Sequence, residues 1–130
     1  MMSTIQEFLT YNKIAVVGVS RKPEKYGYRI FKDLRDKGYE VYPVNPQVDQ
    51  VDGSPCFKDL SSLPTIPEVV CLVVPPEAGR KVVEECIQMG IKRLWFQPGA
   101  ESEELISYCE SQGLSVVHNQ CLMVLSSPKR

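Results

Sequence analysis

A glycine, a hydroxyl group and several cations follow the first apolar run of the sequence. Gly18 lets a ligand approach the backbone closely, and Ser20 can donate a hydrogen bond from its hydroxyl. A helix that begins near Tyr26 would present free N–H groups and the positive end of its dipole to an anion. The cations that can reach phosphate oxygens are Lys25 and either Arg21 or Lys22. Residues 18–26 are therefore predicted to bind phosphate, and an ordinary turn with solvated cations is the alternative.

Three further segments stand where later apolar runs end. They are Asn45-Pro46, Pro75-Pro76 and the segment that begins at Gln97. In an open parallel sheet, ligands bind outside the carboxyl ends of the strands, so these segments are predicted to line the same site. Two consecutive prolines form a stiff apolar wall suited to an adenine or an acyl-type arm, and simple initiation of the next helix is the alternative.

The phosphate-binding segment lacks the signatures of the common nucleotide-binding loops. No GxGxxG motif is present, since the glycine after Gly18 is Gly27, and no GK[ST] motif of a Walker loop occurs. Asn45-Pro46 replaces the acid that would bind a ribose 2′-hydroxyl. An NADP-type site is still an alternative, because cations replace that acid in sites that bind NADP. In this sequence, however, the cations follow the first strand and not the second.

Catalytic and metal-binding side chains are scarce. His118 is the only histidine, and no acid is placed in sequence to orient it toward the nearby Cys121. The five cysteines include no CxxC pair, which favours reduced thiols, several of them in the core, in a cytosolic protein. The sequence therefore favours a protein that is not an enzyme and that holds no metal.

The charge balance argues against nucleic acid as a partner. The formal net charge is −1 and the pI is about 5.9, well below the basic values of such domains. Residues 21–37 nevertheless hold seven cations against three acids, which suits a small anionic ligand. No apolar run is long enough to cross a bilayer and residues 1–7 carry no secretion signal, so no membrane partner is expected.

Short apolar runs alternate with helical patterns, which predicts an α/β fold. The predicted strands are residues 13–17, 39–44, 69–74, 94–96 and 114–117. The helical patterns between them end at Gly38, Gly90 and Gly113, where a left-handed glycine is favoured. Residues 1–130 are therefore expected to form a single domain with a doubly wound, mainly parallel five-stranded Rossmann-like sheet and helices on both faces.

Local signals predict three further features. A short leading helix over residues 4–11 is expected to carry a capping box of Thr4 and Glu7, and Ser102 is expected to cap a later helix. Residues 47–67 are rich in proline and lack a clear period, so we expect them to loop over one edge of the sheet.

Taken together, these segments resemble the small CoA-binding domain family, whose stand-alone members are similar to the N-terminal domain of the succinyl-CoA synthetase alpha subunit. The resemblance extends from about Ile14 to Cys121. It is carried by Gly18-Val19-Ser20 with Pro23, Lys25 and Tyr28, by residues 38–46, 73–77 and 95–100, and by Cys121.

The resemblance implies a Rossmann-type domain that binds coenzyme A in the crevice at the strand ends. The implied contacts are Val19 and Ser20 at the pyrophosphate, Lys25 and Arg21 on the phosphates, Asn45 and Pro46 beside the nucleotide, Val74, Pro75 and Pro76 on the adenine side, and Gln97 at the far wall. Lys25 and Gly27 stand where many relatives have Arg and Ser, and Asn119-Gln120 replaces a frequent Asp-Arg pair. The phosphohistidine of the synthetase lies in a domain outside the resemblance, so ligase activity is not implied.

The sequence therefore predicts a cytoplasmic, non-catalytic protein whose small-molecule partner is coenzyme A or an acyl-CoA. The alternatives are an NADP-type dinucleotide binder, which includes a redox enzyme, and a subunit-interaction domain with a vestigial crevice. Covalent storage of CoA through a disulfide with one of the cysteines is a further alternative. A protein partner or a homo-oligomer is compatible with each of these functions.

Overall fold

A parallel sheet of five strands lies at the centre of the computed structural model, which describes residues 3–129. Its strands are β1 (Lys13–Val17), β2 (Glu40–Val44), β5 (Val69–Leu72), β6 (Arg93–Phe96) and β7 (Ser115–Val117). They are ordered β2-β1-β5-β6-β7, and every neighbouring pair is parallel. The predicted doubly wound α/β architecture is confirmed.

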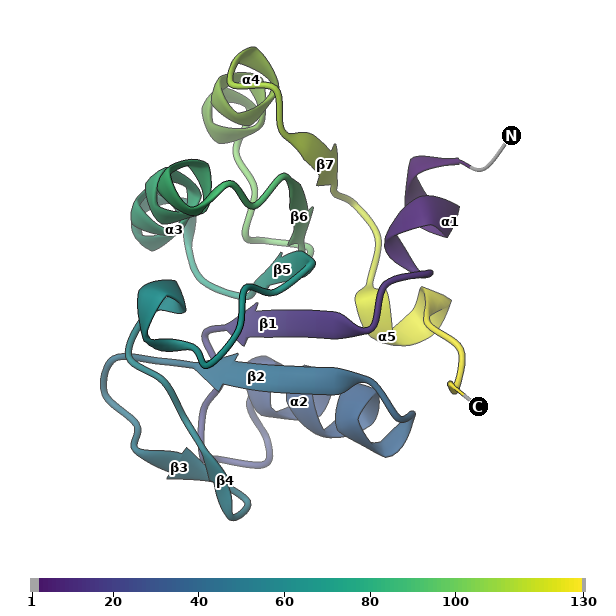
Figure 1. Ribbon diagram of the computed structural model, residues 1–130, viewed down its shortest axis with the longest axis vertical. Helices are drawn as coiled ribbons and strands as arrows, with labels where there is room; N and C mark the ends of the chain where they lie inside the picture. Colours follow the sequence, from purple (N-terminus) through teal and green to yellow (C-terminus); the bar gives the residue numbers. More distant parts are fainter. Residues whose placement is uncertain (1–2, 130) are drawn as a thin grey trace.

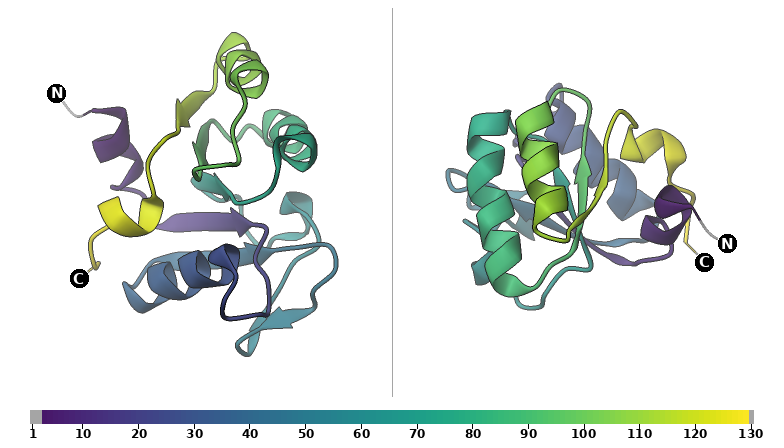
Figure 2. Two further views of the ribbon diagram at one scale, coloured as in Figure 1. Left: turned by 180° about the vertical axis from the view of Figure 1, so that it is seen from behind. Right: turned by 90° about the horizontal axis from the view of Figure 1, so that it is seen from above.

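Helices cover both faces of the sheet (Figure 1). They are α1 (Thr4–Phe8), α2 (Tyr26–Asp36) and α5 (Leu122–Leu125) on one face, and α3 (Pro76–Met89) and α4 (Glu103–Ser111) on the other. Figure 2 shows α3 and α4 side by side, with α2 and α5 on the opposite side of the strands. No helix within residues 3–129 is both long enough and apolar enough to span a bilayer.

Successive residues of β1 alternate between two hydrophobic cores. Ile14 and Val16 pack into the core under α1, α2 and α5, whereas Ala15 and Val17 pack into the core under α3 and α4. All four side chains are buried. A strand that is covered on both faces reads as a continuous apolar run, which is why the sequence pattern located the strands well.

The strand order reverses beside β1. Val17 at the end of β1 pairs with Val44 of β2 on one side and with Leu72 of β5 on the other. The loops that leave these three strands therefore start next to one another. A doubly wound sheet holds its ligand at this point, outside the carboxyl ends of the strands.

The capping box of the first helix lies one residue earlier than predicted. The Ser3 hydroxyl accepts the Gln6 N–H at 3.1 Å, and Gln6 Oε1 accepts the Ser3 N–H at 2.9 Å. The prediction of Thr4 and Glu7 was wrong because Thr4 already belongs to the helix, while Ser3 has the extended backbone that a capping residue needs. The other predicted cap is confirmed, since Ser102 accepts the Leu105 N–H at 3.1 Å.

Residues 47–67 contain more regular structure than predicted. A small antiparallel hairpin pairs β3 (Gln50–Val51) with β4 (Ser54–Pro55), and a 3-10 helix, η1, follows at Leu60–Ser62. Between the two, Phe57 forms a parallel bridge with Val44, so this segment extends the sheet beyond β2. The short elements escaped prediction because two-residue strands carry no detectable period.

Candidate functional site

The loop that follows β1 is pinned between its two neighbouring strands. The Gly18 N–H donates to the Val44 carbonyl at 2.9 Å. Gly18 has a φ of +105°, and a Cβ atom there would lie 2.7 Å from the Val73 carbonyl oxygen. Only glycine fits this position, because the backbone turns in the left-handed region and passes directly over the end of β5.

The first turn of α2 lies against this loop. A Cβ atom at Gly27 would overlap the carbonyl oxygen of Gly18, so two glycines bring the helix N-terminus onto the loop. Lys25 is the N-cap residue of α2, and its side chain makes no capping hydrogen bond. The first-turn N–H groups of the helix are therefore not occupied by their own cap and can bind an anion.

The predicted phosphate-binding side chains surround this helix N-terminus. The Ser20 hydroxyl oxygen accepts the Lys22 N–H at 3.1 Å, which leaves the hydroxyl hydrogen available to a ligand. Arg21, Lys22 and Lys25 are all exposed. Within residues 3–129, none of the three forms an ion pair with a carboxylate, so their charge adds to the dipole of α2.

Val19 and Asn45 fix the conformation of the loop by a hydrogen bond between them. The Val19 side chain is fully buried, and its carbonyl oxygen accepts a hydrogen bond from Asn45 Nδ2 at 2.9 Å. Asn45 Oδ1 in turn accepts the Gln47 N–H at 2.9 Å. The asparagine predicted to border a nucleotide thus ties the ends of β1 and β2 together, and its amide is already hydrogen-bonded within the protein.

An apolar groove of about 610 Å³ opens beside the start of the loop. Small-molecule sites have volumes of about 300 to 1,000 Å³, so the groove is large enough for a nucleoside. Its lining residues are Val17, Val44, Pro46, Lys58, Asp59, Leu60, Val74, Glu77, Ala78, Lys81, Val82 and Glu85. Two of the predicted site residues, Pro46 and Val74, belong to it. The groove runs between η1 and α3 at the carboxyl ends of β1 and β2, and its floor is apolar.

The outer wall of this groove was missed by the sequence analysis. Leu60 is buried, and Glu85 of α3 holds η1 in place by accepting the N–H groups of Leu60 and Ser61, both at 3.1 Å. The wall depends on contacts between segments that are far apart in the sequence. The amphipathic pattern of α3 could have located Val82, but no local signal places η1 opposite it.

A smaller cavity of about 220 Å³ lies beyond the groove, between the loops that follow β5 and β6. It is lined by Val73, Val74, Pro75, Gln97, Pro98, Gly99 and Ala100. Pro75 is the N-cap of α3 and Pro76 its first residue, as the sequence predicted. Pro76 itself faces a third cavity of about 620 Å³ between the N-termini of α3 and α4. The predicted residues of the β5 and β6 loops therefore lie along a continuous edge of the sheet.

Gln97 is completely buried, and its side chain makes three hydrogen bonds to residues of the protein. Its Oε1 accepts the Leu122 N–H at 2.7 Å, and its Nε2 donates to the Tyr26 hydroxyl at 3.2 Å and to Cys121 Sγ at 3.4 Å. Tyr26 Oη and Cys121 Sγ are themselves 2.9 Å apart. Gln97 thus joins the start of α2 to the segment that follows β7, and its amide lies beneath the crevice.

The remaining candidates for chemistry are the single histidine and the five cysteines. His118 is exposed, and residues 3–129 contain no group of three His, Cys, Asp or Glu side chains that could hold a metal ion. All five cysteines are free thiols. Cys71, Cys86 and Cys109 are buried, and burial raises the pKa of each. These three match the predicted core thiols.

Known proteins are similar to this chain in sequence and in fold. A family model described as a CoA binding domain matches residues 12–127. The alpha subunit of ADP-forming acetate–CoA ligase II from Pyrococcus furiosus is 27% identical over 92% of this chain, which spans 29% of that subunit. Uncharacterized protein YneT of Bacillus subtilis is 31% identical over 92% of this chain and 90% of its own length. The solved structure of a conserved hypothetical protein from Pyrococcus furiosus has 46% identity and a TM-score of 0.84, covering 88% of this chain and 98% of the other.

Proposed function

Because this chain belongs to the CoA-binding domain family, we propose that it binds coenzyme A, or an acyl-CoA, at the carboxyl ends of β1, β2 and β5. The observation that carries the proposal is the contact between Gly18 and Gly27, which brings the uncapped N-terminus of α2 onto the loop after β1. This arrangement suits the diphosphate of an adenine nucleotide. Lys25, together with either Arg21 or Lys22, would neutralise the remaining phosphate charge.

Two cavities along the strand ends, one on the β1 and β2 side of the end of β5 and one on its β6 side, suit the two ends of coenzyme A. The groove that contains Pro46 and Val74 has the size and the apolar floor that an adenosine needs. The cavity between Pro75 and Gly99 lies in the opposite direction along the strand ends. In this proposal the adenosine occupies the groove, and the pantetheine arm runs past Pro75 toward the smaller cavity.

The proposal assigns no catalytic step to this chain. The two amide side chains predicted for the site, Asn45 and Gln97, make hydrogen bonds within the protein. The acetate–CoA ligase subunit that this chain resembles is much longer, since the chain spans 29% of it. We therefore propose a carrier or sensor of CoA. A CoA ligand and five free thiols both fit a reducing compartment, and we propose the cytoplasm.

A ligand panel tests the proposed function. Coenzyme A at about 100 times its dissociation constant is expected to stabilise the protein by about 2.7 kcal/mol, which raises the melting temperature by about 10 °C. 3′-Dephospho-CoA and NADP serve as comparisons in the same thermal-shift measurement. Stabilisation by NADP but not by CoA would favour the dinucleotide-binding alternative, and no shift with any nucleotide would favour an interaction domain with a vestigial crevice.

Removing one cation from the helix N-terminus is expected to weaken CoA binding. In Lys25→Ala the dissociation constant should rise about tenfold, because a hydrogen bond to a charged phosphate contributes about 1.5 kcal/mol. Lys92→Ala is the matched control, since Lys92 is also exposed but precedes β6 at the opposite edge of the sheet. Calorimetry should show a loss in the first variant only. Equal affinities for both variants would place the phosphates elsewhere.

A further inference from the structure

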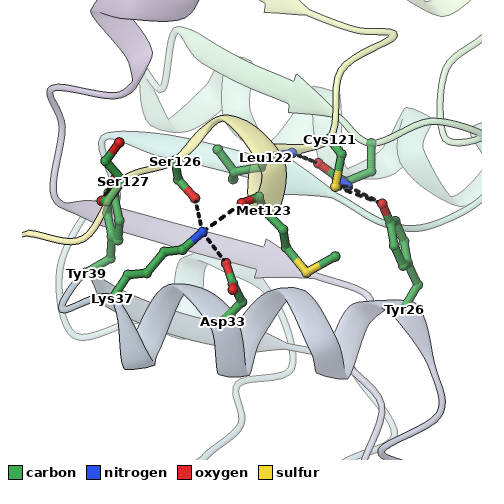
Figure 3. Close-up of polar contacts among 10 residues, drawn as sticks. Tyr26, Asp33, Lys37, Tyr39, Cys121, Leu122, Met123, Ser126 and Ser127 are labelled. Atoms are coloured by element: carbon green, nitrogen blue, oxygen red, sulfur yellow. Dashed lines mark hydrogen bonds and ion pairs between the residues drawn. The ribbon is translucent and has the colours of Figure 1, made fainter.

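One of the five thiols has surroundings that the other four lack. Cys121 is half-buried at the start of α5, between the Tyr26 hydroxyl at 2.9 Å and Gln97 Nε2 at 3.4 Å (Figure 3). Burial opposes ionisation of the Cys121 thiol, but these hydrogen bonds and those from the Met123 and Val124 backbones outweigh it and lower its pKa. By contrast, burial raises the pKa of Cys56, the other half-buried thiol.

Tyr26 Oη and Cys121 Sγ share one hydrogen bond, in which either atom can be the donor. That hydrogen bond and partial burial raise the pKa of Tyr26 to about 12, and the same hydrogen bond helps to lower the pKa of Cys121. When the Cys121 thiol is ionised, the tyrosine hydroxyl donates to the sulfur. Gln97 Nε2 can only donate. Two donors aimed at one sulfur atom stabilise a thiolate, which is the nucleophilic form of cysteine.

This cluster borders the proposed CoA site on two sides. Tyr26 is the first residue of α2, directly after the loop that we propose for the diphosphate. Gln97 both lines the cavity of about 220 Å³ and donates to Cys121. Independently, the family match over residues 12–127 includes all three residues and points to a ligand whose pantetheine arm ends in a thiol. That arm is longer than the tyrosine side chain that separates the helix N-terminus from Cys121.

We propose that Cys121 forms a mixed disulfide with the terminal sulfur of coenzyme A, which rests on the proposed function. The co-reactant is CoA disulfide. The Cys121 thiolate attacks one sulfur of its S–S bond, a new S–S bond joins the cysteine to one CoA, and the other CoA leaves as a thiolate that takes up a proton. The disulfide is exchanged, and no further oxidant is required. Tyr26 and Gln97 are positioning residues that hold the thiolate.

Intact mass spectrometry tests this proposal. The reduced protein, incubated with CoA disulfide, is expected to gain the mass of one CoA, which dithiothreitol removes. The gain should persist in Cys56→Ser and disappear in Cys121→Ser. Because the bound nucleotide raises the local concentration of the disulfide, the reaction should be about tenfold faster or more than with glutathione disulfide. Modification of Cys56 instead, or equal rates with both disulfides, would overturn the proposal.

Two further measurements separate this proposal from the proposed function. Calorimetry with reduced CoA measures binding alone. If the protein binds reduced CoA but forms no adduct with CoA disulfide, only the proposal of a mixed disulfide is rejected. If it neither binds CoA nor forms the adduct, both proposals are rejected. In Tyr26→Phe the sulfur loses one donor, which raises its pKa. The pH profile of Cys121 alkylation by iodoacetamide should then move to higher pH. An unchanged profile would show that Tyr26 does not stabilise the thiolate.

Discussion

Gly27→Ala is expected to abolish measurable CoA binding and to lower the free energy of unfolding by about 3 kcal/mol. The added methyl group would overlap the carbonyl oxygen of Gly18, which is backbone and cannot rotate away. Either α2 or the loop must shift, and the proposed diphosphate site lies between them. Calorimetry with CoA and urea denaturation should show the two losses together, because one displacement causes both.

Gly79→Ala is the matched control for this prediction. Gly79 is also a buried helical glycine near a helix start, but its added Cβ would meet only ends of side chains and no backbone, with Leu105 Cδ2 at 3.3 Å and Leu72 Cδ2 at 3.5 Å. Alanine has the higher helix propensity, so the free energy of unfolding should change by less than about 1 kcal/mol. If Gly27→Ala bound CoA as well as Gly79→Ala does, the contact between α2 and the loop would not be needed for the site.

The sequence predicted well those features that depend on local pattern. The apolar runs located all five strands of the parallel sheet because strands buried on both faces have few polar positions. The positions of the strand ends then located the loops at Gly18, Asn45, Pro75 and Gln97 by topology alone. The left-handed glycine at the end of α3, Gly90, was also predicted, because a residue without a Cβ adopts the left-handed conformation without strain.

Side-chain direction could not be predicted in the same way. Asn45 and Gln97 were both predicted to contact the ligand, and that prediction stays open; the structure adds that their amides join segments of the protein. The sequence places them at strand ends but carries no information about which neighbour satisfies each amide. The same holds for Cys121, since its partners Tyr26 and Gln97 lie far from it in the chain.

The C-terminal segment contacts both ends of α2. Cys121 touches Tyr26 at the start of the helix, and Lys129 N–H donates to the Lys37 carbonyl at its end, at 2.7 Å. The Tyr39 hydroxyl adds a hydrogen bond to the Ser127 carbonyl at 3.0 Å. The interactions that hold the C-terminal segment in place therefore also hold α2. They matter for the proposed phosphate site because α2 presents its N-terminus to that site. Figure 3 shows Cys121 beside Tyr26 at the start of α2, and Met123 and Ser126 beside Lys37 at its end.

Lys37→Met is expected to lower the free energy of unfolding by about 2 kcal/mol. The Lys37 ammonium lies 2.7 Å from Asp33 Oδ2, 2.7 Å from the Met123 carbonyl oxygen and 3.0 Å from Ser126 Oγ. Asp33 Oδ2 is buried and makes no other hydrogen bond within residues 3–129. Without the ammonium, that carboxylate oxygen would be left buried and uncompensated, and urea denaturation should detect the loss.

A second ion pair on the same helix provides the control. Lys32 pairs with Asp36 at 2.8 Å with the same spacing of four residues, but both side chains are about half exposed, at 49% and 57%. Such surface pairs contribute little, so Lys32→Met should leave the free energy of unfolding nearly unchanged. Replacing Asp33 by leucine together with Lys37→Met removes the uncompensated charge and should recover part of the stability. Equal losses in Lys32→Met and Lys37→Met would mean that solvent screens both pairs alike, and that the C-terminal segment is held mainly by apolar packing.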